Sequence, residues 1–261
     1  MPGRFMAPVV ASRTFGCASE LVVEVPPSFH AEPGQFVQVL CGGPGNLLRR
    51  PYSLFAADRG TASLLVREVG AGSAWLRSRR AGEELDLLGP LGRGFALEGA
   101  GSRLLVAGGM GIVPLRFLAS RIRERGEEAA LYWGMESREE YGDLPGLLQG
   151  EFNLHLATMD GSAGRRGSVL DLFRAAYGGE HAAVYACGPR AMLAGLAATM
   201  GGAGDAALQV CMEERMACGV GACRGCAVPA RDPEGGYLTV CRDGPVFHAA
   251  ELDWGRIWAW R

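Results

Sequence analysis

Four of the eight cysteines follow a spacing that can hold an iron–sulfur cluster. Cys218, Cys223 and Cys226 lie in MACGVGACRGC, and Cys241 follows after fourteen intervening residues in VCRDGP. A C-x4-C-x2-C run with a distant fourth cysteine is the plant-type pattern for a 2Fe-2S cluster. The interspersed glycines would let backbone amides approach the cluster sulfides. A zinc site, which favours two C-x2-C pairs, and inert thiols are the alternatives.

A second group of residues could bind a flavin dinucleotide. The segment RPYS follows the apolar run GQFVQVL, and GAGS follows about twenty residues later. RPYS supplies a cation for a pyrophosphate, an aromatic ring and a small hydroxyl, and GAGS could open a helix whose first amides face the same pyrophosphate. A strand end with a solvated arginine is the alternative. The expected contacts are Arg50, Pro51, Tyr52, Ser53, Gly72 and Ser73.

Two further segments are typical of nicotinamide dinucleotide binding. GGMG lies between the apolar run RLLVA and an expected helix, and ACGP follows another expected strand. Loops at the carboxyl ends of parallel strands are where open α/β sheets bind ligands. GGMG is not the G-x-G-x-x-G fingerprint, and a tight turn is its alternative. The expected contacts are Gly108, Gly109, Gly111, Cys187, Gly188 and Pro189.

The elements that must position these residues change in character along the chain. Short runs rich in Val and Leu, separated by Pro and Gly, predict an antiparallel β-barrel over residues 1–99. Alternating strand and helix patterns predict a parallel α/β domain over residues 100–205. The periodicity fades afterwards, so a cluster-organised segment is expected over residues 206–261. The fold class is therefore an all-β barrel followed by an α/β domain and a C-terminal cluster segment.

The composition excludes several classes of function. All 26 basic residues are Arg, so Schiff-base chemistry and the lysine of a P-loop are unavailable. A net charge of −2 provides no global basic field for nucleic acid or for an anionic membrane. We expect no membrane-spanning helix and, because the N-terminus lacks a signal-peptide pattern, a cytoplasmic location. Cys17, Cys41 and Cys211 are expected to be buried apolar residues.

The order of these motifs resembles the ferredoxin–NADP reductase superfamily. RPYS, GAGS, GPLGRGF, GGMGIVPL, DGSAGRRG and ACGPRAML occur in the order typical of that superfamily. The last two motifs, MEERMACGVGACRGC and VCRDGPVF, resemble closely the electron-transfer subunits of class 1B, NAD-linked dihydroorotate dehydrogenases. The resemblance covers nearly the whole chain, from about residue 10 to residue 252.

The resemblance implies an electron relay in de novo pyrimidine (UMP) biosynthesis. Electrons from a partner subunit that oxidises dihydroorotate on FMN would pass through the 2Fe-2S cluster and FAD to NAD. It also adds Leu65, Val66 and Arg67 to the expected FAD contacts, and it implies a heterotetramer of two subunit pairs. No side chain of this chain is expected to act as a catalytic acid or base.

Two alternative functions remain. One is the similar subunit of NADH-dependent ferredoxin:NADP oxidoreductases, and the other is a redox-sensing protein that uses its cluster as a switch. The sequence does not distinguish NAD from NADP, so NAD is taken from the resemblance.

Overall fold

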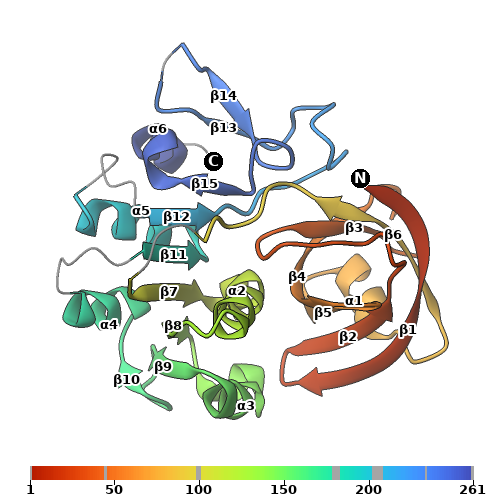
Figure 1. Cartoon of the computed structure of the whole chain (residues 1–261), viewed down its shortest axis with the longest axis horizontal. Coiled ribbons are helices and arrows are strands. Elements are labelled where there is room, and N and C mark those ends of the chain that lie inside the picture. The colour runs from red at the N-terminus through yellow and green to blue at the C-terminus, as the bar shows by residue number, and fades with distance from the viewer. Residues whose placement is uncertain are drawn as a thin grey trace.

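The computed structural model describes residues 2–43, 46–97, 101–177, 183–201, 208–232 and 234–259. Figure 1 shows a barrel beside a sheet with helices, and the C-terminal segment lies over both. Both expected domain boundaries, between residues 99 and 100 and between 205 and 206, lie outside the described residues. No helix of the described chain combines the length and apolar character needed to cross a membrane.

The first part of the chain is a closed barrel of six antiparallel strands in the order β1-β2-β5-β4-β3-β6. Its strands alternate side chains between two faces, so residues such as Val37 and Val39 fill the barrel core. Helix α1 closes one end, because its Leu76 is fully buried in the same core. The elements are β1 (Gly3–Phe15), β2 (Ala18–Glu24), β3 (Phe36–Leu40), β4 (Arg50–Asp58), β5 (Thr61–Arg67), α1 (Ala71–Arg77) and β6 (Glu84–Leu91).

The second part is a seven-stranded sheet in the order β10-β9-β8-β7-β11-β12-β15. All its neighbouring strands are parallel except β12 and β15, which are antiparallel. Helices cover both faces, and the central strands therefore read as continuous apolar runs. The elements are β7 (Arg103–Gly108), η1 (Gly109–Gly111), α2 (Ile112–Glu124), β8 (Ala129–Met135), η2 (Arg138–Tyr141), α3 (Leu144–Glu151), β9 (Asn153–Thr158), β10 (Arg165–Arg166), α4 (Val169–Ala176), β11 (Ala183–Cys187), α5 (Arg190–Thr199) and β12 (Leu208–Cys211).

The C-terminal segment shares the sheet and the core of the α/β part. Strand β15 pairs with β12, and Phe247 packs in one core with Val210 of that strand. Cys226 and Cys241 belong to this core too. The sequence suggested a segment organised mainly by its ligand, whereas the structure gives it a hydrophobic core continuous with the sheet. Its elements are β13 (Ala227–Pro229), β14 (Tyr237–Thr239), β15 (Val246–His248), η3 (Ala249–Glu251) and α6 (Trp254–Ala259).

Helix α2 joins the barrel to the sheet. Its Leu115 and Leu118 pack against the sheet, while Phe117 reaches into the barrel core. Arg121 of the same helix donates a hydrogen bond of 2.9 Å from Nη2 to the carbonyl oxygen of Ala57 in β4. The two parts are therefore held together by apolar packing and by a hydrogen bond between side chain and backbone.

The substitution Phe117→Ala tests this joint. Removing a fully buried ring should lower the free energy of unfolding by about 3–5 kcal/mol, because Phe117 is 1% exposed. Chemical denaturation measures the change. The control Leu147→Ala, at a side chain 38% exposed on α3, should stay within about 0.5 kcal/mol of the original chain. A small loss for Phe117→Ala would show that α2 does not couple the two parts.

Candidate functional site

The four expected cluster ligands lie together as two pairs. The backbone N–H of Cys223 donates to Sγ of Cys218 at 3.4 Å, and that of Cys241 donates to Sγ of Cys226 at 3.4 Å. Gly221 donates a third such bond to Sγ of Cys241 at 3.1 Å. Cys223 is exposed whereas Cys226 and Cys241 are buried. Backbone donors aimed at sulfur are what a thiolate-bound cluster requires, since they stabilise its negative charge.

The two pairs differ in the acidity of their thiols. Burial raises the pKa of Cys218, but the backbone N–H groups of Cys223, Val220 and Ala222 outweigh it and lower that pKa to about 6. Burial, together with the neighbouring Cys226, raises the pKa of Cys241 to about 12. Cys218 is therefore ready to bind a cation at neutral pH, while Cys241 needs the positive charge of a bound metal to lose its proton.

The four thiols and the backbone donors around them fit an iron–sulfur cluster. The sulfur atoms of Cys218, Cys226 and Cys241 each accept a hydrogen bond from a backbone N–H of the same segment. A structural zinc ion needs four ligands around one centre, whereas a 2Fe-2S cluster spreads its four thiolates over two irons. The residues present therefore fit a 2Fe-2S cluster, which the thiolates of Cys218, Cys223, Cys226 and Cys241 would hold.

The expected flavin residues meet at a cavity of about 300 Å3 between the barrel and the sheet. The strand β4 contributes Pro51, Tyr52 and Ser53, and β5 contributes Leu65 and Arg67. Arg67 also forms an ion pair of 2.7 Å with Glu140 of η2, across the joint between the two parts. The cavity has an apolar body with few polar groups, as cofactor sites commonly do.

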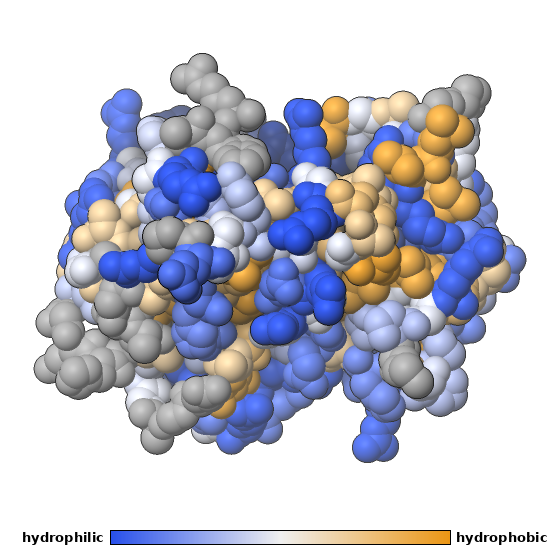
Figure 2. Space-filling view, turned by 90° about the horizontal axis from the view of Figure 1, so that it is seen from above, coloured by the Kyte–Doolittle hydropathy of each residue, from blue (hydrophilic) through white to orange (hydrophobic). Residues whose placement is uncertain are grey.

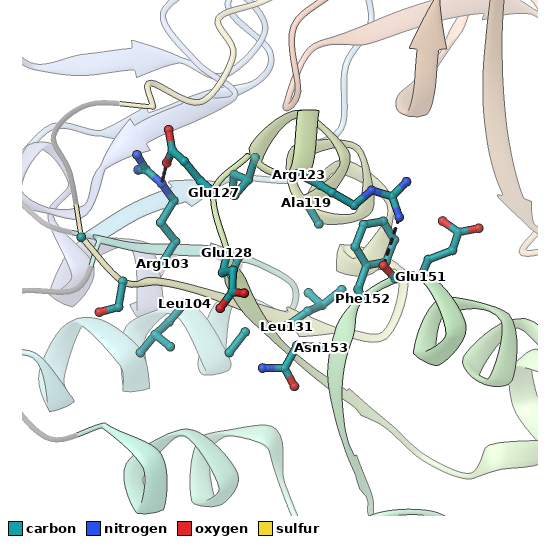
Figure 3. A pocket seen from close by; sticks show the side chains of 15 residues that line it. Arg103, Leu104, Ala119, Arg123, Glu127, Glu128, Leu131, Glu151, Phe152 and Asn153 are labelled. Carbon is teal, nitrogen blue, oxygen red and sulfur yellow. Dashed lines mark hydrogen bonds and ion pairs between the residues drawn. The ribbon is translucent and has the colours of Figure 1, made fainter. Parts of the chain in front are cut away.

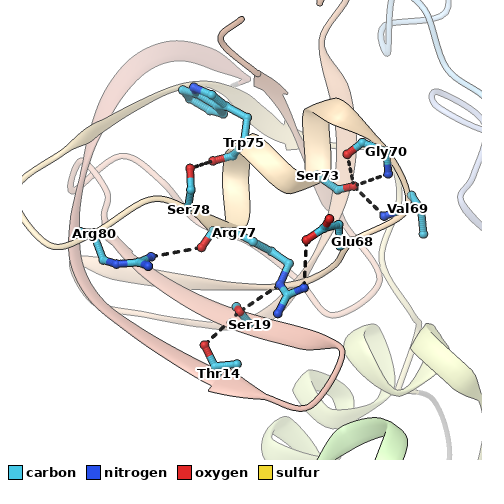
Figure 4. A network of polar contacts seen from close by, with 10 residues as sticks. All are labelled: Thr14, Ser19, Glu68, Val69, Gly70, Ser73, Trp75, Arg77, Ser78 and Arg80. Atoms are coloured by element: carbon cyan, nitrogen blue, oxygen red, sulfur yellow. Dashed lines mark hydrogen bonds and ion pairs between the residues drawn. The ribbon is translucent and has the colours of Figure 1, made fainter.

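Four expected flavin residues lie outside the lining of this cavity. Arg50 lies beside Gly72, since a Cβ on Gly72 would be 3.7 Å from Cγ of Arg50. The side chain of Val66 is fully buried in the barrel core, so only its backbone could reach a ligand. The hydroxyl of Ser73 accepts hydrogen bonds from Val69 and Gly70 and donates one to Gly70, which Figure 4 shows. This hydroxyl is therefore already used in the turn that opens α1.

The expected nicotinamide residues form two loops in direct contact. They lie at the carboxyl ends of β7 and β11, where Gly108 and Cys187 are the last residues of the strands. The two strands are neighbours in the sheet and pair Ala107 with Cys187. A Cβ on Gly111 would lie 2.0 Å from the carbonyl oxygen of Cys187, and a Cβ on Gly188 would lie 2.9 Å from the nitrogen of Gly108. These glycines are therefore required by the packing of one loop on the other. Gly109, with a φ of +53°, and the exposed Pro189 remain accessible.

Cys187 is fully buried and faces protein. Its thiol lies 4.0 Å from Oε1 of Glu213 and beside Cys211 in the next strand. The hydrogen bond to Cys211 and burial raise the pKa of Cys187 well above its usual value. It therefore remains a thiol, and a contact with a dinucleotide would come from its backbone.

Glu213 lines the candidate flavin cavity and belongs to none of the expected cofactor contacts. It lines the same cavity as Tyr52 and Ser53, and burial raises the pKa of its carboxyl. Met110, Met212 and Met216 line the cavity as well. The signal available in the sequence is the pair of acidic residues in MEERMAC, directly after an apolar strand.

A larger cavity of about 780 Å3 lies at the opposite end of the sheet. It is lined by the residues that begin β7, β8 and β9, and Figure 3 shows Arg103 and Glu127 turned toward one another. Arg103 bonds Glu127 at 2.6 Å, and Arg123 bonds the carbonyl oxygen of Glu151 at 3.1 Å. Open parallel sheets commonly bind ligands at the carboxyl ends of their strands. The smaller cavity lies at that end, where Met110 follows β7 and Met212 follows β12.

Known proteins resemble this chain over its cluster segment and over nearly its whole length. Residues 213–253 match the family described as the iron–sulfur cluster binding domain of dihydroorotate dehydrogenase B. The dihydroorotate dehydrogenase B (NAD(+)) electron transfer subunit of Bacillus caldolyticus is 39% identical over 256 residues, covering 94% of each chain. The subunit of the same name from Fusobacterium nucleatum is 35% identical, covering 85% of this chain and 86% of that one.

Two solved structures share the whole architecture. An NADH-dependent reduced ferredoxin-NADP oxidoreductase superimposes with a TM-score of 0.82 at 26% identity, covering 100% of this chain and 96% of that one. Phthalate dioxygenase reductase superimposes with a TM-score of 0.68 at 18% identity, covering 96% and 97%. The second likeness concerns the fold alone.

The substitution Gly111→Ala tests the contact between the two nicotinamide loops. Its Cβ would overlap backbone atoms of Cys187 that cannot move independently of β11, so we expect a loss of more than 2 kcal/mol in the free energy of unfolding. The matched control is Gly146→Ala in α3, where a Cβ meets no atom within 4 Å. That change should stabilise the chain by about 0.5–1 kcal/mol. Equal effects of the two substitutions would contradict the packing argument.

The raised pKa of Glu213 predicts a pH dependence of stability. The folded chain holds this proton to a higher pH than the unfolded chain, whose carboxyl has the ordinary value of 4.5. The protonated carboxyl contributes to the stability of the folded chain. This contribution is complete below the pKa of the unfolded chain and is lost as the pH rises through the pKa of the folded chain. Relative to Glu213→Gln, the original chain should therefore lose thermal stability as the pH increases from about 4.5. If the melting temperatures of the two proteins change equally with pH, this expectation is contradicted.

Proposed function

The chain belongs to the family of electron transfer subunits of dihydroorotate dehydrogenase B, and we propose that it passes electrons from an FMN-containing, dihydroorotate-oxidising subunit through a 2Fe-2S cluster and FAD to NAD⁺. This reaction would serve de novo pyrimidine (UMP) biosynthesis. The observation that carries the proposal is one continuous arrangement of the cavity, the two nicotinamide loops and the cluster loop.

The lining of the cavity joins the three sites. Met110 belongs to the first nicotinamide loop, Tyr52 and Ser53 belong to the barrel, and Met216 lies two residues before the first cluster cysteine. FAD, when bound, exchanges two electrons as hydride with a nicotinamide and single electrons with an iron–sulfur cluster. The reaction therefore needs a flavin held between the nicotinamide and the iron–sulfur cluster.

The expected residues take separate roles in holding the cofactors. Arg50 and the first turn of α1 bind the pyrophosphate of FAD, and Tyr52 and Ser53 contact its ring system. The loops after β7 and β11 bind NAD, with backbone groups providing the contacts. Cys218, Cys223, Cys226 and Cys241 bind the cluster. In terms of function, residues 1–99 bind FAD, residues 100–205 bind NAD, and residues 206–261 bind the cluster.

The chemistry requires no acid or base from this chain toward the pyrimidine. The chain orients its cofactors and excludes water from the space between them, because the cavity is bordered by apolar side chains such as Phe36, Val113 and Met212. Oxidation of dihydroorotate belongs to the partner subunit.

The cluster loop offers a face for that partner. Val220 and Cys223 are exposed, so one iron of a bound cluster would lie close to the surface. Figure 2 shows hydrophobic surface gathered at the end of the molecule where the barrel lies, and the exposed apolar side chains of the barrel include Met6, Leu40, Leu47 and Leu48. An assembly of two subunit pairs in the cytoplasm, where the ligand thiols stay reduced, completes the proposal.

A second candidate is the corresponding subunit of an NADH-dependent ferredoxin:NADP oxidoreductase. The similarity in fold to that enzyme, with a TM-score of 0.82 over the whole chain, supports it. The two functions differ in the partner subunit, and only the second candidate uses NADP(H) in addition to NAD(H). One assay therefore separates them.

The decisive experiment co-expresses the chain with the dihydroorotate-oxidising subunit and measures NAD⁺ reduction driven by dihydroorotate. We expect activity that depends on both subunits, FAD and two irons per chain of this protein, and two subunit pairs by light scattering. Oxidation of NADPH coupled to the reduction of NAD⁺ and ferredoxin, with no requirement for dihydroorotate, would support the second candidate. Zinc without flavin would overturn both.

The substitution Cys226→Ser separates the two halves of the relay. It should reduce dihydroorotate-dependent NAD⁺ reduction more than 100-fold, because one iron loses a buried ligand. NADH-dependent reduction of a dye by FAD should persist at a reduced rate. Cys17→Ser, at a cysteine outside the cluster segment, is the control and should keep both activities. Equal losses of both activities in Cys226→Ser would contradict the proposed order of cofactors.

A further inference from the structure

A buried side chain of the barrel has no hydrogen-bond partner and faces the cluster loop. Gln38, in the middle of β3, is 0% exposed. Both its amide atoms, Nε2 and Oε1, are without a hydrogen-bond partner among the described residues. Its backbone pairs with Pro51 of β4 and Leu88 of β6, and its carbonyl oxygen also accepts a hydrogen bond from Nη1 of Arg49 at 3.3 Å. Burying an amide without partners costs free energy, so this position calls for an explanation.

The two faces of β3 have different surroundings. Val37 and Val39 point into the barrel core. Phe36 points the other way, where it lines the cavity and packs in the same core as Cys226 and Cys241. Gln38 shares the face of Phe36, because side chains alternate along a strand. Its amide is therefore directed out of the barrel and toward the C-terminal segment.

The amide group lies directly against the cluster loop. A Cβ on Gly219 would be 2.4 Å from Nε2 of Gln38 and 2.9 Å from its Cδ. Gly219 follows Cys218, and its φ of +71° is suited to glycine. The space that a side chain at position 219 would take is thus filled by the Gln38 amide, next to a cluster ligand.

We propose that Gln38 donates a hydrogen bond from its amide N–H₂ to a sulfur of the 2Fe-2S cluster on the Cys218 side, and thereby raises the reduction potential of the cluster. Nitrogen is the amide atom that can donate to sulfur, and the orientation of the amide follows from this. The inference rests on the proposed function in one respect, namely that Cys218, Cys223, Cys226 and Cys241 hold this cluster.

The physical reason for the effect is charge. Reduction of the cluster adds one electron and changes no bond at Gln38, so the cluster becomes more negative by one unit. A donor aimed at sulfur stabilises the reduced form more than the oxidised form, which raises the potential. The position of Gln38 matters for the relay, because β3 pairs with β4 at Pro51 and Tyr52 and so lies between the flavin cavity and the cluster loop.

The first test removes the donor and keeps the length of the side chain. In Gln38→Met, an EPR-monitored redox titration of the assembled protein should give a lower cluster midpoint. The expected change is about tenfold in the equilibrium constant for one-electron reduction, equivalent to 59 mV. Gln38→Leu should shift the midpoint in the same direction. Iron, sulfide and FAD contents should equal those of the original protein.

The matched control is Ser63→Ala in β5. Ser63 is also buried, and its hydroxyl has no hydrogen-bond partner among the described residues, but it lines a different cavity, with Arg116 and Phe117. Its removal should leave the cluster midpoint unchanged. If Ser63→Ala lowers the midpoint as much as Gln38→Met, the effect comes from disturbing the barrel, and the proposal is overturned.

A second measurement uses the original protein and does not depend on whether a variant at position 38 folds. Pulsed EPR of the reduced cluster, in protein labelled with 15N at the glutamine side-chain amides, should detect a coupled nitrogen. Gln35→Met should retain that coupling. No coupling in the original labelled protein, or an unchanged midpoint in Gln38→Met with a complete cluster, would overturn the proposal. A protein without any 2Fe-2S spectrum would instead refute the proposed function itself.

Discussion

Strand β3 carries the constraint on which the rest of the arrangement depends, because both of its faces are buried. One face closes the barrel core with Val37 and Val39, and the other meets the flavin cavity and the cluster loop with Phe36 and Gln38. A strand in the wall of a barrel usually turns one face to solvent. Here the second face is covered by the segment that follows β12. Strand β3 therefore contacts the barrel core, the cavity and the cluster loop.

The glycines show how a sequence signal and its structural cause can differ. Glycine at the end of a strand suggests that the backbone approaches a phosphate closely. At Gly111 and Gly188 the missing Cβ instead makes room for the backbone of the neighbouring loop, and at Gly219 it makes room for the amide of Gln38. This packing holds the two loops after β7 and β11 in a fixed position relative to each other.

Charge in the site is arranged by burial and by backbone donors, with few ion pairs. The same thiol group is acidified at Cys218 by loop amides and made less acidic at Cys241 by burial and a neighbouring cysteine. Burial raises the pKa of the Glu213 carboxyl. A chain without lysine thus sets its local electrostatics mainly by burial and by backbone donors. The electron transfer requires no amine, so the absence of lysine does not impair it.

The sequence by itself determined the barrel, the parallel sheet and the cluster cysteines, because each depends on local periodicity or on spacing within one short segment. It did not identify Glu213 or Gln38, and it did not separate Val66, which points into the barrel core, from its neighbours Leu65 and Arg67, which line the cavity. It also did not indicate that the cluster segment shares the core of the sheet through β12 and β15. Only the tertiary structure decided these points, because each one depends on which residues distant in the chain occupy the space beside them.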